Sequence, residues 1–186
     1  MGEIYRGFVQ ALHLIAAGDP ELVRVTLLSL EVTGIALLFS TLVGVPLGSF
    51  MGLRRFPARH LVIALLYTGM GFPPVVVGLF VYLMLSRVGP AGFLGWLFTP
   101  KAMVISQVII SFPLVAGFTM AAVMGVDPNL RQQVLSLGAT EWQATLAILR
   151  EARIGVVVSI IAGFGSIISE VGSVMLVGGN IQGSTR

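Results

Sequence analysis

Long apolar runs alternate with short charged segments along this chain of 186 residues. Four stretches contain no charged residue: 32–53, 61–86, 102–126 and 154–169. A helix rises about 1.5 Å per residue, so roughly 20 apolar residues cross the 30 Å or so of hydrocarbon in a bilayer. The first three stretches are long enough by themselves, and the fourth is long enough if Glu170 is included. Because backbone amides in lipid must be satisfied within the segment, the pattern predicts an all-α, polytopic helical membrane protein with about four transmembrane helices.

Start and stop signals give the expected bounds of these helices. Near the N-terminus, apolar residues recur at helical spacing beside charged ones, which predicts a short interfacial helix that contains Ile4, Phe8, Leu12 and Ile15. Asp19, Pro20 and Glu21 then supply a cap, a first-turn proline and a first-turn acid, so the first span is expected to run from there to Leu53. The other spans are expected at about 61–86, 102–126 and 154–177.

The basic loop between the first two spans sets the expected orientation. Arg54, Arg55 and Arg59 cluster at the end of a span, and such clusters favour the cytoplasmic side. This places both termini outside and the polar segment 127–153 in the cytoplasm. The total count of basic residues on the two sides barely differs, so the clustering carries the prediction.

Composition narrows the class of protein further. Hydrophobic residues make up 56% of the chain and charged residues 10%, against roughly 25% charged in a typical soluble domain. We therefore expect a single transmembrane domain over 1–186, surrounded by membrane lipid. Eleven Lys and Arg against eight Asp and Glu is too small an excess to indicate nucleic-acid binding. The lack of Cys excludes disulfides, thiolate metal sites and cysteine nucleophiles, and no metal site is expected. A cleaved signal peptide is not expected either.

Prolines inside the spans indicate where helices break. Pro73 and Pro74 remove two backbone donors, and Pro113 removes one in the third span. Broken helices in membranes occur where they are buried or line a cavity, so these prolines are candidates for a translocation path. The alternative is that the kinks only shape packing. Glu170 is costly in lipid and is expected to face the bundle interior, in a structural or gating role.

Segment 127–153 reads as two helices joined by a sharp turn. Asp127 is placed to cap a helix opened by Pro128, and Gly138 suits a left-handed end. Thr140 and Gln143 form a capping box for the second helix. Apolar residues on this segment, Trp142 and Leu149 among them, would let it dock into a groove of another protein. It could equally pack only on its own bundle.

The same segment resembles the coupling loop of ABC importer permeases, whose pattern is E-A-A, three residues, Gly, nine residues, then I-x-L-P. Gly138 and Ala139 match the central Gly-Ala, and Ile148 stands at the expected place. Gln132-Gln133-Val134 replaces E-A-A, and Arg150-Glu151 replaces the final L-P. The resemblance implies that 127–153 is a cytoplasmic coupling loop that seats the chain on a separate ATPase.

Two further segments resemble the oxyanion permeases among these importers, and tungstate permeases most of all, with molybdate and sulfate permeases close behind. Segment 71–80, GFPPVVVGLF, is similar to their Pro-Pro-Val-Val-Val-Gly segment, and 169–186 is similar to their G-E-F-G-A…A-G-N-I-P-G-x-T ending. The resemblance implies a type I ABC importer fold in the inner membrane, an extracytoplasmic oxyanion-binding protein and a second permease subunit, as a homodimer. It also implies a further membrane helix beyond the segment that ends here with GSTR.

No Lys or Arg lies in the middle of a span, so an anion in transit would meet hydroxyls, backbone N–H groups and helix N-termini. Candidates, besides the proline positions, are Ser111, Ser166 and Ser169. Gly44, Gly48 and Gly52 form a stripe that allows close approach of a partner helix, expected within the same chain.

Two other classes of protein fit less well. A secondary transporter or channel predicts paired intramembrane charges or inverted repeats, and only Glu31 and Glu170 lie near the spans. An enzyme is not expected, because the chain has neither a Gly-rich phosphate loop nor an H-E-x-x-H motif. This chain therefore needs no cofactor of its own, and ATP and Mg would bind to the partner ATPase.

Overall fold

The computed structural model describes residues 5–7, 9, 15, 17–54 and 56–186. The expected interfacial helix falls largely outside this part, because Ile4, Phe8 and Leu12 are not among the described residues. The described helices are α2 (Pro20–Leu53), α3 (Arg59–Gly71), α4 (Pro74–Leu85), the 3-10 helix η1 (Gly92–Leu94), α5 (Pro100–Met124), α6 (Pro128–Ser136), α7 (Glu141–Glu151), α8 (Arg153–Ile168) and α9 (Gly172–Gly178).

The start of α2 follows from its local sequence. The Asp19 side chain accepts hydrogen bonds from the backbone N–H groups of Glu21 and Leu22, at 3.0 and 3.1 Å. These are donors that a helix start leaves unpaired. The predicted bounds of this helix, including its end at Leu53, are confirmed.

Two helices, α2 and α5, are long and apolar enough to cross a membrane alone. Two pairs pass the same test together although each is bent: α3 with α4 by 101°, and α7 with α8 by 59°. The described residues therefore hold between two and four crossings, in agreement with a multi-pass membrane protein.

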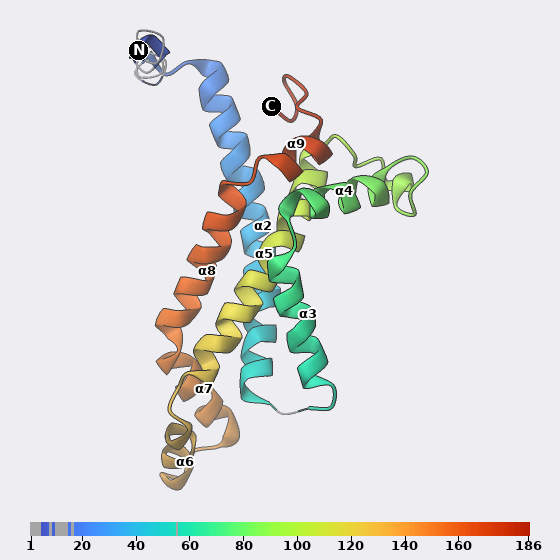
Figure 1. The fold of residues 1–186 in the computed structure, drawn as a ribbon. Helices are drawn as coiled ribbons and strands as arrows, with labels where there is room; N and C mark the ends of the chain where they lie inside the picture. Colours follow the sequence, from blue (N-terminus) through green and yellow to red (C-terminus); the bar gives the residue numbers. More distant parts are fainter. Residues whose placement is uncertain (1–4, 8, 10–14, 16, 55) are drawn as a thin grey trace.

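The glycine stripe of α2 packs against α5 of the same chain, as expected. A Cβ added at Gly48 would lie 2.3 Å from the backbone oxygen of Ala116, and one at Gly52 would lie 2.8 Å from Val123 Cγ1. Distances this short leave no space for a side chain at these positions, so only glycine fits there. Helix α5 also packs against α3, α4, α8 and α9, so it is the central helix of the fold (Figure 1).

The expected length of the fourth span is wrong. It was expected to reach Val177, but α8 ends at Ile168 and α9 turns away to pack on α4. A kink or break was expected at Pro113; the break is absent, because α5 continues through this residue as one helix. Pro113 is buried against α3, where a Cβ added at Gly69 would lie 3.1 Å from its ring.

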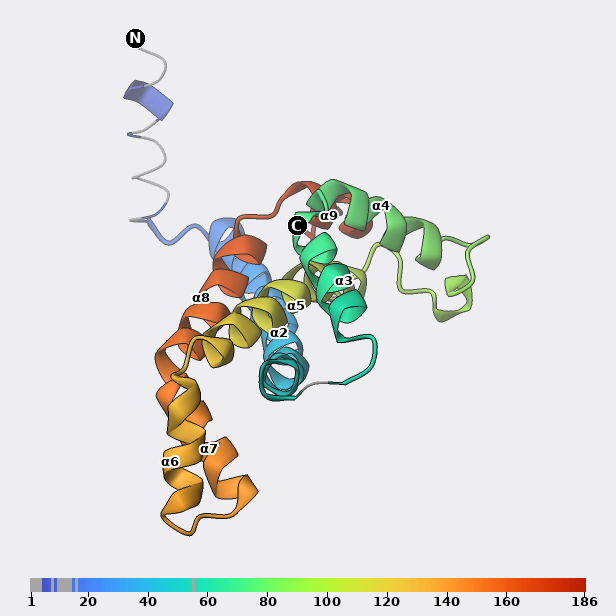
Figure 2. The ribbon, with the colours of Figure 1, turned by 60° about the horizontal axis from the view of Figure 1, so that its bottom comes forward.

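The chain passes back and forth between two ends of the bundle. The end of α2, the start of α3 and the hairpin of α6 and α7 lie at one end, while α9, the C-terminus and the start of α2 lie at the other (Figure 1). Figure 2 shows that α6 and α7 extend away from the remaining helices. The start of α2 and the C-terminus therefore lie on the same side of the bundle (Figure 1).

Cysteine labelling tests which side that is. Ser184 and Ala58 are both exposed and lie at opposite ends, and the chain has no cysteine of its own. With single Ser184→Cys and Ala58→Cys variants, an impermeant thiol reagent on intact cells is expected to label only position 184, because the Arg54 loop favours the cytoplasm. Labelling only at position 58 would invert the orientation.

Candidate functional site

The sharp turn between α3 and α4 follows from its two prolines. Phe72 and Pro73 each precede a proline, which disfavours helical dihedrals, and both are extended with ψ of 131° and 127°. Pro74 is then the first residue of α4, where its missing N–H costs nothing. The expected break is therefore confirmed.

The break lies beside the segment that joins α8 to α9, although about 100 residues separate them in sequence. A Cβ added at Gly172 would lie 2.9 Å from Val75 Cγ2 and 3.4 Å from Glu170 Oε1. One turn further along α4, a Cβ at Gly78 would lie 2.7 Å from the Cα of Ser173. The two glycines thus let α4 and α9 meet closely, and they bring the Pro73–Pro74 break next to Glu170.

Glu170 has a clear structural contact in this arrangement. Its Oε1 accepts a hydrogen bond of 2.8 Å from the backbone N–H of Ser173, in the first turn of α9. A carboxylate at this position satisfies a helix-start donor and matches the helix dipole. The side chain is half-buried, as expected of a carboxylate held against protein.

The three candidate serines lie in different surroundings. Ser169 is exposed, and its hydroxyl donates to the carbonyl oxygens of Gly165 and Ser166 in its own helix. Ser166 is half-buried one turn earlier. Ser111 is fully buried and bonded to Ser40 at 2.6 Å, so it lies inside the bundle, apart from the open face of the break. Pro113 is likewise buried.

A buried polar seam inside the bundle was missed by the sequence reasoning. It links three helices through Ser40 on α2, Gln107 and Ser111 on α5, and the carbonyl oxygen of Ile167 on α8. Gln107 donates to that carbonyl at 3.2 Å, while its own Oε1 is buried without a partner among the described residues. Polar residues four apart in an apolar span, as Gln107 and Ser111 are, were the available signal.

The helical hairpin has the predicted caps. Asp127 accepts from Asn129 N at 2.9 Å, and the capping box of Thr140 and Gln143 is complete, with bonds of 2.8 and 3.3 Å. Gly138 joins the two helices at φ +86°, in the left-handed region. An exposed ion pair between Arg131 and Glu141 links them as well.

The apolar residues of the hairpin divide between two faces. Ile148 and Ala144 are buried, and Ile148 packs with Val123 and Ala152 of the bundle. Leu137 and Trp142 remain 87% and 72% exposed. Ile148 therefore fixes the hairpin to its own chain, while Trp142 and the Gly138–Ala139 turn are free to meet another molecule. Leu149 lies between these extremes and is half-buried.

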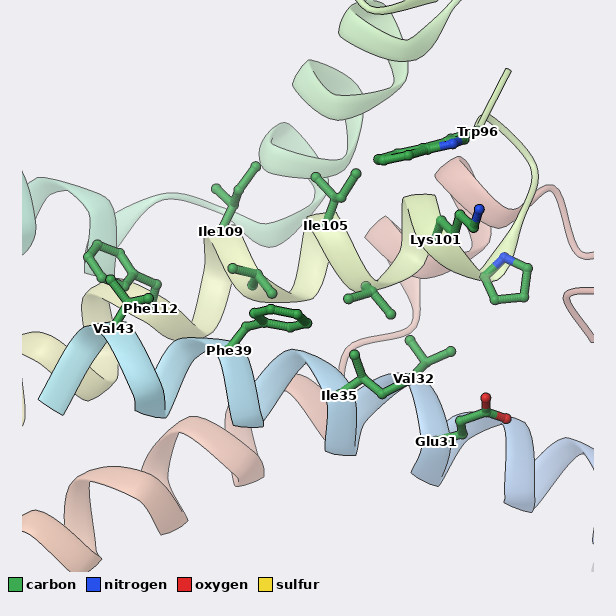
Figure 3. A pocket seen from close by; sticks show the side chains of 13 residues that line it. Glu31, Val32, Ile35, Phe39, Val43, Trp96, Lys101, Ile105, Ile109 and Phe112 are labelled. Carbon is green, nitrogen blue, oxygen red and sulfur yellow. The ribbon is translucent and has the colours of Figure 1, made fainter. Parts of the chain in front are cut away.

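A groove of about 700 Å³ runs between α2 and α5 on the outside of the bundle. Its walls are apolar, and Phe39, Ile105 and Phe112 face it in Figure 3. Glu31 and Lys101 lie together at one end, where the Lys101 ammonium is 5.3 Å from the Trp96 ring. This end carries both signs of charge.

Comparison with known proteins adds a family match and three similar permeases. Residues 44–185 match the family of binding-protein-dependent transport system inner membrane components. The chain is 38% identical to a tungstate uptake system permease protein of Peptoclostridium acidaminophilum, over 100% of this chain and 82% of that protein. It is 43% identical to a probable anion ABC transporter permease protein of Haloferax volcanii, over 90% and 74%. A molybdenum transport system permease protein of Escherichia coli K12 is 33% identical, over 90% and 76%.

Proposed function

Because the chain belongs to the family of binding-protein-dependent transport system inner membrane components, we propose that it is the inner-membrane permease subunit of an ATP-driven importer for tungstate. The assignment of tungstate as the substrate rests on the similarity of the whole chain to a tungstate permease. It is joined by the meeting of segment 71–80 with segment 169–186, the two segments that resemble oxyanion permeases.

The chemistry of the break suits a tetrahedral dianion in transit. No Lys or Arg lies within the apolar stretches, so the available partners are neutral: hydroxyls, backbone N–H groups and the start of α4 just after Pro73. Neutral donors hold an anion briefly, whereas a buried, unpaired cation would be expensive and would trap it. The proposed path runs along Pro73, Pro74, Ser166 and Ser169. Glu170 lies beside it in a structural or gating role, and Ser111 and Pro113 support it from inside the bundle.

The hairpin of α6 and α7 is the proposed contact with the ATPase. The turn between α6 and α7 extends away from the remaining helices (Figure 2), Trp142 is 72% exposed, and Ile148 anchors the hairpin to the bundle. A hairpin that is rigid at its caps and fixed at its base would transmit a push from the ATPase into α5 and α8. Hydrolysis of ATP with Mg then belongs to the ATPase, and no catalytic step is assigned to this chain.

The complete importer would also contain two copies of this chain and an extracytoplasmic oxyanion-binding protein. Two copies are proposed because the break near Pro73 is open on one side: Phe72, Val75 and Val76 are exposed beside it. A second subunit facing this side would close a path between the two. High-affinity selection would then rest with the binding protein.

Uptake by the complete, full-length complex in proteoliposomes tests this function. With labelled tungstate, molybdate and sulfate offered in turn, tungstate is expected to accumulate fastest. Molybdate is the second candidate, because a molybdenum permease is 33% identical to the chain. Accumulation of another solute with none of the three would refute the oxyanion assignment, and uptake without an ATPase would favour a secondary transporter or channel.

In the same assay, a Ser166→Ala/Ser169→Ala variant is expected to lower tungstate uptake by about tenfold or more. Each hydroxyl removed takes away a bond to a charged group that is worth about 1.5–3 kcal/mol when formed. A Thr68→Ala variant is the control, since that exposed hydroxyl donates to Ala64 on α3. Wild-type uptake in the double variant would remove these serines from the path.

A further inference from the structure

A second groove lies at the end of the bundle that carries the hairpin. It has a volume of about 690 Å³ and runs between α2, α7 and α8. Most of its lining is apolar, and the α2 wall runs from Val45 to Leu53. On α7 it is lined by Trp142, Thr145 and Leu149, which share one face at spacings of three and four residues.

The charges at this groove all have one sign. Arg54 and Arg153 line it, and no acidic side chain does. Within the part of the chain that the structure describes, the single salt bridge is between Arg131 and Glu141, so neither of these arginines is paired there. The groove between α2 and α5 differs, because its lining includes both an acidic residue, Glu31, and a basic one, Lys101 (Figure 3).

A buried hydroxyl lies deeper in the same groove. Ser49 lines it, is only 6% exposed, and its Oγ has no hydrogen-bond partner among the described residues. Buried polar groups are normally paired, so the hydrogen-bonding capacity of this hydroxyl is unused within the described residues. Ser49 precedes Arg54 by five residues, which places it about 7 Å further along the helix.

The dimensions match one leaflet of a bilayer. From Val45 to Arg54 the helix rises about 13 Å, close to half of the roughly 30 Å hydrocarbon core. Trp142, an interfacial type of residue, is also part of the lining. Basic pockets between membrane helices on the cytoplasmic side are suited to anionic lipid head groups.

We infer that this groove binds one anionic phospholipid of the inner leaflet. Arg54 and Arg153 hold its phosphate, the Ser49 hydroxyl donates to an ester carbonyl oxygen below the phosphate, and an acyl chain lies along Val45, Phe50 and Val156. Since α7 forms one wall of the groove, the bound lipid contacts both α7 and α2 and stabilises the position of the hairpin. An effect of the lipid on ATP hydrolysis rests on the proposed function, whereas its binding does not.

Lipid titration followed by native mass spectrometry tests the binding. The purified, delipidated chain is titrated with phosphatidylglycerol and, separately, with phosphatidylcholine, and tighter binding of the anionic lipid is expected. An Arg54→Gln/Arg153→Gln variant should bind phosphatidylglycerol roughly 25-fold more weakly, at about fivefold per basic residue. The matched control, Arg87→Gln/Lys101→Gln, removes two cations from the other end and should bind it as the wild type does.

A Ser49→Ala variant keeps the test decisive if the arginine variant fails to fold. Removing a hydroxyl that has no partner in the protein should leave thermal stability unchanged, yet weaken phosphatidylglycerol binding about threefold to tenfold. Equal binding of the two lipids, or unchanged binding in both groove variants, would overturn the inference. So would a photo-crosslinker at Val157 that captures the ATPase or a second permease instead of lipid. In the complete complex, phosphatidylglycerol should raise the ATP hydrolysis that is coupled to uptake in the wild type and in the control variant. It should not do so in the groove variants that no longer bind it.

Discussion

Replacing Gly48 with alanine is expected to destabilise the bundle by on the order of 3 kcal/mol, the upper part of the range for overpacked sites. The new methyl group would lie 2.3 Å from the carbonyl oxygen of Ala116 and 3.0 Å from Thr119 Cβ. Because the obstacle is backbone, no side-chain rotation relieves it, and α2 must move away from α5. The measurement is the apparent melting temperature and the monodisperse yield of the purified protein.

The matched control lies in the same helix. Gly34 also belongs to α2, but a Cβ there would meet nothing within 4 Å. Gly34→Ala should therefore be neutral, or stabilising by up to about 1 kcal/mol through helix propensity. If the two variants have the same melting temperature, then α2 and α5 do not pack through the glycine stripe.

Features governed by neighbours in sequence were predicted closely. The caps at Asp19, Asp127 and Thr140 each depend on a side chain reaching a backbone donor two or three residues away. The turn at Gly138 and the break at Pro73–Pro74 depend on the dihedral limits of single residues. Such effects act whatever the rest of the chain does, so the sequence alone was sufficient to place them.

Features governed by tertiary contacts were missed or misplaced. The break between α8 and α9 contains no proline; it is held by Glu170 capping Ser173 and by α9 packing on Gly78. Pro113 does not end α5, which continues through it to Met124. The Ser40–Ser111 bond joins residues 71 positions apart, and no local pattern pairs them.

The candidate path combines segments that the sequence singled out with a contact that only the tertiary structure creates. The sequence singled out segments 71–80 and 169–186 separately, by resemblance. Their contact arises only because α4 turns by 101° and lies against α9. Ser111 was grouped with Ser166 and Ser169 because all three are polar residues in apolar spans, yet the fold buries it in the seam with Ser40.

Replacing Gly138 with valine is expected to uncouple ATP hydrolysis from uptake, lowering the solute moved per ATP by about tenfold. The residue has φ +86°, where an L side chain costs roughly 1–2 kcal/mol and a β-branched one more. A Cβ would meet nothing within 4 Å, so the cost is backbone strain alone. Relieving the strain changes the angle between α6 and α7, while insertion into the membrane is unaffected. Hydrolysis and uptake are measured together in proteoliposomes that contain the ATPase and binding protein.

Two further variants separate coupling from strain in general. Gly95 has φ +62° and equally open surroundings, but it lies at the opposite end of the bundle, so Gly95→Val imposes a similar strain away from the hairpin. Its ratio of uptake to hydrolysis should stay at the wild-type value. Gly138→Asn should keep most of the coupling, because asparagine tolerates left-handed dihedrals better than other side chains. A wild-type ratio in Gly138→Val would show that the hairpin does not transmit the ATPase motion, since the strain at its turn would then have no functional consequence.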